Sequence, residues 1–185
     1  MERLVAATTV ILVVDVQEKL AAAMPDAATE ELLKNASILL EAADALGVRV
    51  VASEQYPTGL GPTVTTLASK LAEMGVKPLP KMAFDACSEL TISRALADSG
   101  ARSVVVLGME AHVCVFQTAR ELVKRGYATY VVADAVASRR EENRRIGLAL
   151  CERAGAVVTC TEAVAFDLLE HAATGAFKAI AKLLR

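Results

Sequence analysis

The fold of this 185-residue chain is organised around the stretch Val104-Val-Val-Leu-Gly-Met-Glu-Ala-His-Val-Cys-Val-Phe-Gln-Thr118. Its first residues, 104–107, are apolar and predict a buried strand that ends at Gly108. Apolar residues then recur at Val115, Phe116, Ala119, Leu122 and Val123, and this spacing predicts a helix. Cys114 is therefore expected where the strand has ended and the helix begins. Backbone N–H groups and the positive end of the helix dipole favour a thiolate there, so Cys114 is the candidate nucleophile.

Strands and helices alternate along the whole chain. Apolar runs predict strands over residues 10–14, 48–52, 76–80, 104–107, 128–133 and 157–160. Helical spacing predicts helices over residues 30–46, 64–74, 90–99, 141–154 and 162–185, besides the helix that ends at Arg125. Thr161 is expected to cap the last helix, which breaks at Thr174 and Gly175. This alternation predicts a three-layer α/β/α fold with a doubly wound, six-stranded parallel sheet in a single domain, residues 1–185.

Composition excludes several classes of partner. The net charge is −2 and aromatic residues make up 4% of the chain, which argues against nucleic-acid binding. No apolar run approaches the roughly 18 residues that span a bilayer. Asp15, Glu18 and Lys19 follow the first apolar run, where a secretory signal peptide would carry small neutral residues. The cysteines form no C-x-x-C pair, so reduced thiols in a cytoplasmic protein are expected, at Cys87, Cys114, Cys151 and Cys160.

Chemically active side chains follow the predicted strands at Asp15, Glu54, Lys81, Cys114 and Asp134. In parallel sheets ligands bind beyond the carboxyl ends of the strands. Asp15 could take the thiol proton, Lys81 could stabilise developing negative charge, and backbone N–H groups could hold an oxyanion. In the strand order 3-2-1-4-5-6, however, Lys81 starts two strands away from Asp15 and must reach inward.

Each of these residues also has a simpler interpretation. Cys114 could be a small buried apolar residue, and Lys81 an ordinary solvated lysine. A Cys–His dyad with His112 is an alternative to Asp15 as the base, although His112 would have to fold back to reach the sulfur. Cys87 could be structural or could form a disulfide with Cys114 under oxidation.

Several motifs occur in order along the chain, namely Val14-Asp15-Val16-Gln17, Lys81-Met82-Ala83-Phe84, Gly108-Met109-Glu110-Ala111-His112-Val113-Cys114-Val115 and Val132-Ala133-Asp134-Ala135. With them the chain resembles the isochorismatase-like cysteine hydrolases, which include nicotinamidases and N-carbamoylsarcosine amidohydrolases. The segment Glu54-Gln55-Tyr56-Pro57, with the Gly-Pro-rich residues after it, is most similar to the short isochorismatase domain-containing subgroup.

The resemblance implies a triad with Asp15 as general base, Lys81 as its partner and Cys114 as nucleophile. It also implies a cis peptide between Met109 and Glu110, which would turn the N–H of Glu110 beside that of Cys114 as an oxyanion hole. Residues expected to line the substrate pocket are Gln17, Gln55, Phe84 and His112. For Gln17 and Phe84 the simpler interpretations are a surface amide and a core ring.

The chain departs from the family pattern at two places. Nicotinamidases carry an Asp-x-His metal motif after the second strand, but this chain has Ser53-Glu54-Gln55 there, and its histidines are His112 and His171. We therefore expect no metal and no cofactor. Asp85 stands where a small polar residue is commoner, and it could pair with Lys81 or point to water. The arginines after the fifth strand are expected on a solvated helix start, at Arg139, Arg140, Arg144 and Arg145.

These features predict a metal-independent cysteine hydrolase that cleaves a small amide or a related C–N bond through a thioester. The alternatives are a catalytically inactive scaffold that binds a small ligand or partner, and an isochorismatase-type hydrolase of an ether. The resemblance also implies a homo-oligomer. The apolar side of the C-terminal helix could supply its interface, or could pack on the protein's own sheet.

Overall fold

The strand at the centre of the sheet, β1 (Thr9–Val14), is buried at every position. The computed structural model describes residues 3–172 and 175–184. β1 pairs in parallel with β2 (Arg49–Gln55) on one side and β4 (Ser103–Met109) on the other. A strand covered on both faces needs apolar side chains pointing both ways, which is why this run shows no polar alternation.

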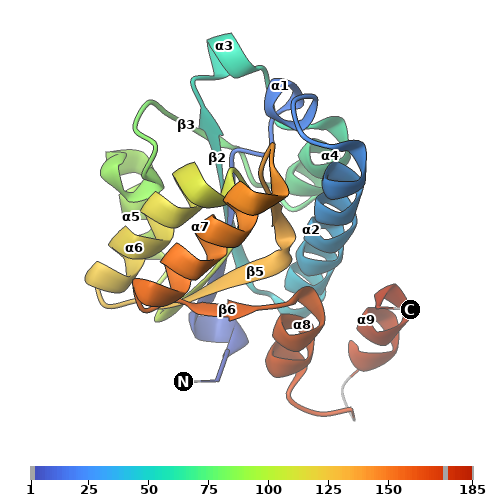
Figure 1. Cartoon of the computed structure of the whole chain (residues 1–185). Helices are drawn as coiled ribbons and strands as arrows, with labels where there is room; N and C mark the ends of the chain where they lie inside the picture. Colours follow the sequence, from blue (N-terminus) through green and yellow to red (C-terminus); the bar gives the residue numbers. More distant parts are fainter. Residues whose placement is uncertain (1–2, 173–174, 185) are drawn as a thin grey trace.

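The six strands lie in the order β3-β2-β1-β4-β5-β6 (Figure 1). The outer members are β3 (Leu79–Lys81), β5 (Ala128–Ala137) and β6 (Val157–Thr159), and all neighbours pair in parallel. The predicted doubly wound parallel sheet is confirmed. The carboxyl ends of the strands point toward the top of Figure 1, where α1 (Glu18–Ala21) and α3 (Pro57–Leu60) lie.

Helices cover both faces of the sheet, and each face has its own apolar core. α2 (Asp26–Leu46), α4 (Thr65–Glu73) and α8 (Thr161–Leu169) pack with Ile11 and Val13. Val10, Leu12 and Val14 point to the opposite face. Around them pack α5 (Leu90–Asp98), α6 (Phe116–Lys124) and α7 (Glu141–Arg153). Short helical turns complete the chain: η1 (Ala6–Thr8), η2 (Ala86–Ser88) and the π-helical η3 (Ala111–Val115).

β4 and β5 run further than the sequence predicts. β4 continues through Gly108 to Met109, and β5 continues past Asp134 to Ala137. A register shift between Val106 and Gly108 adds length to the β4–β5 pairing. Gly108 has φ +126°, and a Cβ there would lie 2.0 Å from the carbonyl oxygen of Val14. Glycine therefore lets the strand continue against β1 where a larger residue would end it.

Other boundaries differ for local reasons. α2 begins at Asp26 because Pro25 occupies its N-cap with extended backbone. Thr161 opens α8 instead of capping it, since Cys160 is the N-cap residue. The helical stretch predicted from residue 162 to 185, with its break at Thr174 and Gly175, consists of two helices, α8 and α9 (Phe177–Leu183). Gly175 lies in a turn between them, and Thr174 lies outside the described residues.

α9 packs on its own subunit beside α2 and α8 (Figure 1). Its buried residue Ile180 contacts a small cluster with Ala42, Ala165 and Leu169. α9 therefore packs on its own chain, as the second interpretation had it, but against helices and not against the sheet. In the described part of the chain, no helix has the length and apolar character that crossing a membrane requires. The four cysteines are unpaired.

Candidate active site

A buried ion pair lies at the carboxyl ends of β1, β2 and β3. The ammonium of Lys81 is 2.8 Å from Oδ2 of Asp15, and both side chains are 0% exposed. Ser53 donates its hydroxyl to Oδ1 of Asp15 at 2.7 Å. Asp15 has φ +52°, a left-handed conformation that Asp and Asn adopt more readily than most residues. A buried charge without a partner is costly, so separating these two groups would be unfavourable. The pairing therefore keeps both groups in one geometry.

Lys81 reaches Asp15 across β2. Gln55 is opposite Lys81 in the β2–β3 register, and its Oε1 accepts a hydrogen bond from the ammonium at 2.5 Å. The carbonyl oxygens of Ala83 and Phe84 accept from the same ammonium at 3.0 and 3.1 Å. The chain therefore curls around the lysine head just after β3, and the ammonium is directed at Asp15. The distance between the first and third strands is bridged by one long side chain.

Cys114 lies beside this pair on the turn η3, which connects β4 to α6. Its thiol is 5% exposed and is placed to hydrogen-bond with Asp15 and Lys81. Burial raises the pKa of the Cys114 thiol to about 12; the charge of Asp15 also raises it, and that of Lys81 lowers it. α7 packs tightly on this turn, since a Cβ at Gly147 would lie 2.6 Å from the backbone of Ala111 and His112.

The expectation of a thiolate at Cys114 is wrong, because burial raises the pKa of this thiol. Sequence reasoning placed the sulfur at a helix start, where the dipole lowers a thiol pKa. In the structure Cys114 is the fourth residue of η3, and burial next to a carboxylate outweighs that effect. A thiol with a raised pKa would need a proton acceptor to act as a nucleophile, and that role for Asp15 stays a prediction.

Glu110 begins the turn that carries Cys114. The peptide bond between Met109 and Glu110 is cis, the configuration that the resemblance implied. The Glu110 carboxylate is held by the backbone N–H and the guanidinium of Arg139. The side chain of Arg139 is 61% exposed at the entrance to α7, as expected for a solvated helix start, and its guanidinium also binds Glu110. Arg144 is also engaged, because it donates to the carbonyl of Ala133 at 2.7 Å.

The four predicted pocket residues have different environments. The amide of Gln17 is buried, not on the surface: it donates to the carbonyls of Gln55 and Gly61 at 3.0 and 2.6 Å and so holds the loop after β2. Gln55 contacts Lys81, as described. Phe84 is 54% exposed, so the core-ring interpretation is wrong. A role in substrate contact stays a prediction for Gln55, Phe84 and His112.

The ring of His112 is directed at the β5–α7 corner. Nδ1 lies 3.1 Å from Oγ of Ser138, and Nε2 lies 3.5 Å from Nδ2 of Asn143. Both ring nitrogens thus contact residues other than Cys114. Asp15 is the better-placed base of the two that the sequence allowed.

The remaining strand-end residues have structural partners. Glu54 accepts the backbone N–H and the hydroxyl of Thr63, each at 2.7 Å. Asp134 lies inside β5 and accepts the N–H and hydroxyl of Thr161 at the start of α8. Asp85 caps η2 by accepting the N–H of Cys87 at 2.8 Å, so neither of its two expected placements is correct. Cys87 is buried, and burial raises the pKa of its thiol to about 12.

Residues that hold a metal would have to gather several oxygen, nitrogen or sulfur ligands. Within residues 3–172 and 175–184 no group of three or more His, Cys, Asp and Glu side chains does so. The three residues at the nicotinamidase metal motif are engaged elsewhere, Ser53 with Asp15, Glu54 with Thr63 and Gln55 with Lys81. A metal-free site stays our prediction.

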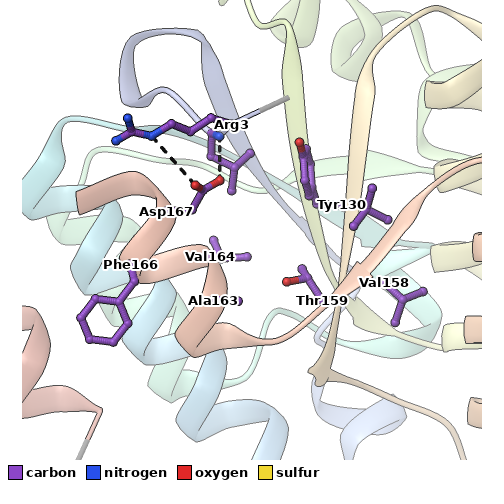
Figure 2. Close-up of a pocket in the computed structure, with 10 residues that line it drawn as sticks. Arg3, Tyr130, Val158, Thr159, Ala163, Val164, Phe166 and Asp167 are labelled. Atoms are coloured by element: carbon purple, nitrogen blue, oxygen red, sulfur yellow. Dashed lines mark hydrogen bonds and ion pairs between the residues drawn. The ribbon is translucent and has the colours of Figure 1, made fainter. Parts of the chain in front are cut away.

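A cavity of about 640 Å³ lies away from these residues, between β6 and α8 (Figure 2). Its walls include Tyr130, Val158, Thr159 and Val164, with Phe166 nearby. At its rim Asp167 accepts the backbone N–H of Leu4 at 2.8 Å and lies 4.0 Å from Nε of Arg3. None of the predicted site residues lines this cavity, so it adds nothing to the triad.

Sequence reasoning missed Ser53 and Arg139 as members of the site. For Ser53 a signal existed, because it directly follows the strand predicted over residues 48–52, and in β2 it pairs in register with Val14, the residue before Asp15. For Arg139 the signal was hidden, because its position depends on the unpredicted extension of β5.

Residues 9–163 match the Isochorismatase domain. The chain belongs to the isochorismatase family. It is 35% identical over 176 residues to isochorismatase domain-containing protein 2 of Danio rerio, covering 95% of this chain and 86% of that protein. It is 36% identical over 180 residues to isochorismatase domain-containing protein 1 of the same organism, covering 97% of this chain and 62% of that protein. The family member described here thus spans less than two thirds of the second relative.

Solved structures show the same fold. One titled as the MAR1 ribonuclease from Caenorhabditis elegans has a TM-score of 0.92 and 34% identity, covering 99% of this chain and 92% of that one. The YcaC gene product of Escherichia coli, titled as an octameric hydrolase of unknown specificity, has a TM-score of 0.88 and 22% identity, covering 98% and 89%. This isochorismatase-family fold is therefore shared with hydrolases.

Proposed function

We propose that this isochorismatase-family protein is a metal-independent cysteine hydrolase that cleaves a small amide, or a related C–N bond, through a thioester on Cys114. The observation that carries the proposal is the buried Asp15–Lys81 pair in contact with the Cys114 thiol. A carboxylate that is fully buried and held by Ser53 and Lys81 is an expensive feature for a mere scaffold. Next to a thiol, this carboxylate can act as a base, and the ammonium of Lys81 can offset the negative charge of the site.

Acylation begins when Asp15 takes the proton from the Cys114 sulfur. The Sγ–C bond forms at the substrate carbonyl carbon, and the resulting oxyanion lies against the N–H groups of Glu110 and Cys114. The C–N bond then breaks, and the amine leaves with the proton that Asp15 carried. Lys81 keeps the carboxylate oriented and offsets the negative charge of the site throughout.

Deacylation uses the same groups in reverse. Asp15 takes a proton from water, whose oxygen attacks the thioester carbon. The C–Sγ bond breaks, the acid product leaves, and the sulfur regains a proton from Asp15. The site returns to a protonated thiol and an ionised carboxylate, which is the resting state that the raised pKa of Cys114 favours.

A nuclease is the alternative that the comparisons raise, since one similar structure is titled as a ribonuclease. The net charge of −2 and the 4% aromatic content give little electrostatic attraction or stacking surface for RNA. We therefore favour the amide substrate and treat RNA as a competing outcome. We further propose that the protein is a cytoplasmic homo-oligomer formed by one domain, as its octameric neighbour is an oligomer.

The proposal is tested by incubating purified protein with a panel of small neutral amides and measuring released ammonia or amine. We expect release by the wild type and by Cys151→Ala, and loss of release in Cys114→Ala. Cys151 is the matched control because it is also buried and burial raises its thiol pKa to about 12, yet neither Asp15 nor Lys81 contributes to that rise. Cys114-dependent cleavage of a short RNA without amide hydrolysis would contradict the proposal.

A further inference from the structure

The carboxylate of Glu110 is bound by the backbone and the side chain of Arg139. Its Oε2 accepts the backbone N–H of Arg139 at 3.0 Å and the Nε of Arg139 at 3.1 Å, and its Oε1 lies 3.1 Å from Nη2. The Glu110 side chain is 8% exposed, whereas that of Arg139 is 61% exposed. We call this set of contacts the Glu110–Arg139 clamp. Burial alone would raise the pKa of Glu110, but the hydrogen bonds and charge of Arg139 hold it below the usual range.

The clamp joins two elements that meet only because β5 is long. Met109 and Ala137 are paired in the β4–β5 register, and Arg139 follows two residues later at the entrance to α7. On its other side Glu110 begins the turn that carries Cys114, where its carbonyl accepts the N–H groups of Val113 and Val115 at 3.0 and 3.2 Å. Strand pairing before Glu110, the turn after it and the clamp on its side chain together fix this residue.

The exposure of Arg139 shows that its role is not to fill the core. A bidentate arginine–carboxylate contact is among the more directional interactions available to a protein. Glu110, its carboxylate partner, also carries the backbone N–H that the resemblance assigns to the oxyanion hole. Fixing the side chain therefore also restricts rotation of the peptide unit that carries this N–H.

We propose that Arg139 is a positioning residue for the oxyanion hole: through the clamp it holds the N–H of Glu110 in the direction that receives the substrate oxygen. This inference rests on the proposed function, because it assumes that negative charge develops on an oxygen next to Cys114. Backbone donors stabilise such an oxyanion only when they are held in place before the charge appears.

Two thiol reagents separate positioning from general damage. When Sγ bonds to the terminal carbon of acrylamide, the C=C electron pair shifts and negative charge develops on the amide oxygen. The neighbouring carbon then takes the proton that left the thiol. When Sγ displaces iodide from iodoacetamide, no charge develops on the amide oxygen. Only the first reaction depends on an oxyanion hole, and peptide mapping assigns each adduct to Cys114.

We expect Arg139→Ala to slow the acrylamide reaction of Cys114 at least about tenfold while leaving the iodoacetamide reaction unchanged. Arg139→Lys should recover part of the acrylamide rate, since it keeps a cation near Glu110. The control is Arg140→Ala, an exposed neighbour whose side chain makes no cap hydrogen bond to α7.

Each other outcome overturns the inference in a recognisable way. An unchanged acrylamide rate in Arg139→Ala would show that the clamp does not position the donor. Equal slowing of both reactions would show a structural role only. If Cys114 of the wild type reacts with neither reagent, the proposed function fails, and the inference fails with it.

Discussion

Lys81→Met should lower the free energy of unfolding by about 3–5 kcal/mol, because it leaves a buried carboxylate without its cation. The Lys81 and Asp15 side chains are both 0% exposed and 2.8 Å apart, so water is not available to replace the ammonium. The hydroxyl of Ser53 still donates to Asp15 in this variant, but it carries no positive charge. Urea denaturation at neutral pH measures the change.

Two variants make this result specific to the ion pair. Lys124→Met makes the same chemical change at a side chain that is 78% exposed, and it should cost at most about 1 kcal/mol. Adding Asp15→Asn to Lys81→Met should restore part of the lost stability, because the charge is gone and asparagine tolerates the φ of +52° at this position. Equal losses in Lys81→Met and Lys124→Met would contradict a buried pair.

Asp15→Asn should change the site in two opposite directions. Burial raises the pKa of Cys114 to about 12, the negative charge of Asp15 adds to that rise, and Lys81 lowers it. Removing the charge should therefore lower the pKa of Cys114 and leave more thiolate at neutral pH. Turnover should nevertheless fall by about 10²–10⁴-fold, because the group that moves protons to the amine and from water is lost.

Two measurements on the same preparations test this pair of effects. The pH dependence of iodoacetamide labelling at Cys114 gives the thiol pKa, and the rate of amine release gives turnover. Cys114→Ala identifies the labelling that belongs to this residue, since Cys87 and Cys151 are also buried thiols. If turnover in Asp15→Asn rises in step with the thiolate fraction, Asp15 is not the general base.

The architecture could be predicted from the sequence because local patterns determine it. The apolar run of β1 and the regular alternation of strand and helix specify a parallel sheet covered on both faces. Asp15 and Cys114 could be placed near each other, because adjacent strands β1 and β4 end at the same edge. These conclusions needed only the period of the apolar residues and the handedness of βαβ connections.

The reach of Lys81 could not be predicted, because it depends on register across three strands. Gln55 must stand opposite Lys81, and the chain after β3 must curl so that Ala83 and Phe84 offer their carbonyls to the ammonium. A pattern of apolar residues carries no information about either. The same limitation hid the exposure of Phe84, since a ring in a curled loop points outward despite its apolar character.

The ionisation of Cys114 was mispredicted for a related reason. Sequence places the thiol near a helix start, but its pKa depends on burial and on the distance to a carboxylate that is remote in the chain. The contact between Arg139 and Glu110 was missed because β5 runs past Asp134 to Ala137, with a register shift between Val106 and Gly108 in its pairing with β4. The positions of charged groups depend on tertiary geometry more strongly than the positions of helices and strands do.

The most direct test of the central claim is a search for an acyl group on Cys114 during turnover. Wild-type protein is mixed with an amide that it hydrolyses, quenched in acid and analysed by intact-mass spectrometry and peptide mapping. We predict a mass increase equal to the acyl group, located on the peptide that contains Cys114, removed by hydroxylamine and lacking in Cys114→Ala. Amide hydrolysis that continues in Cys114→Ala, with no acyl group on the wild-type thiol, would contradict the account.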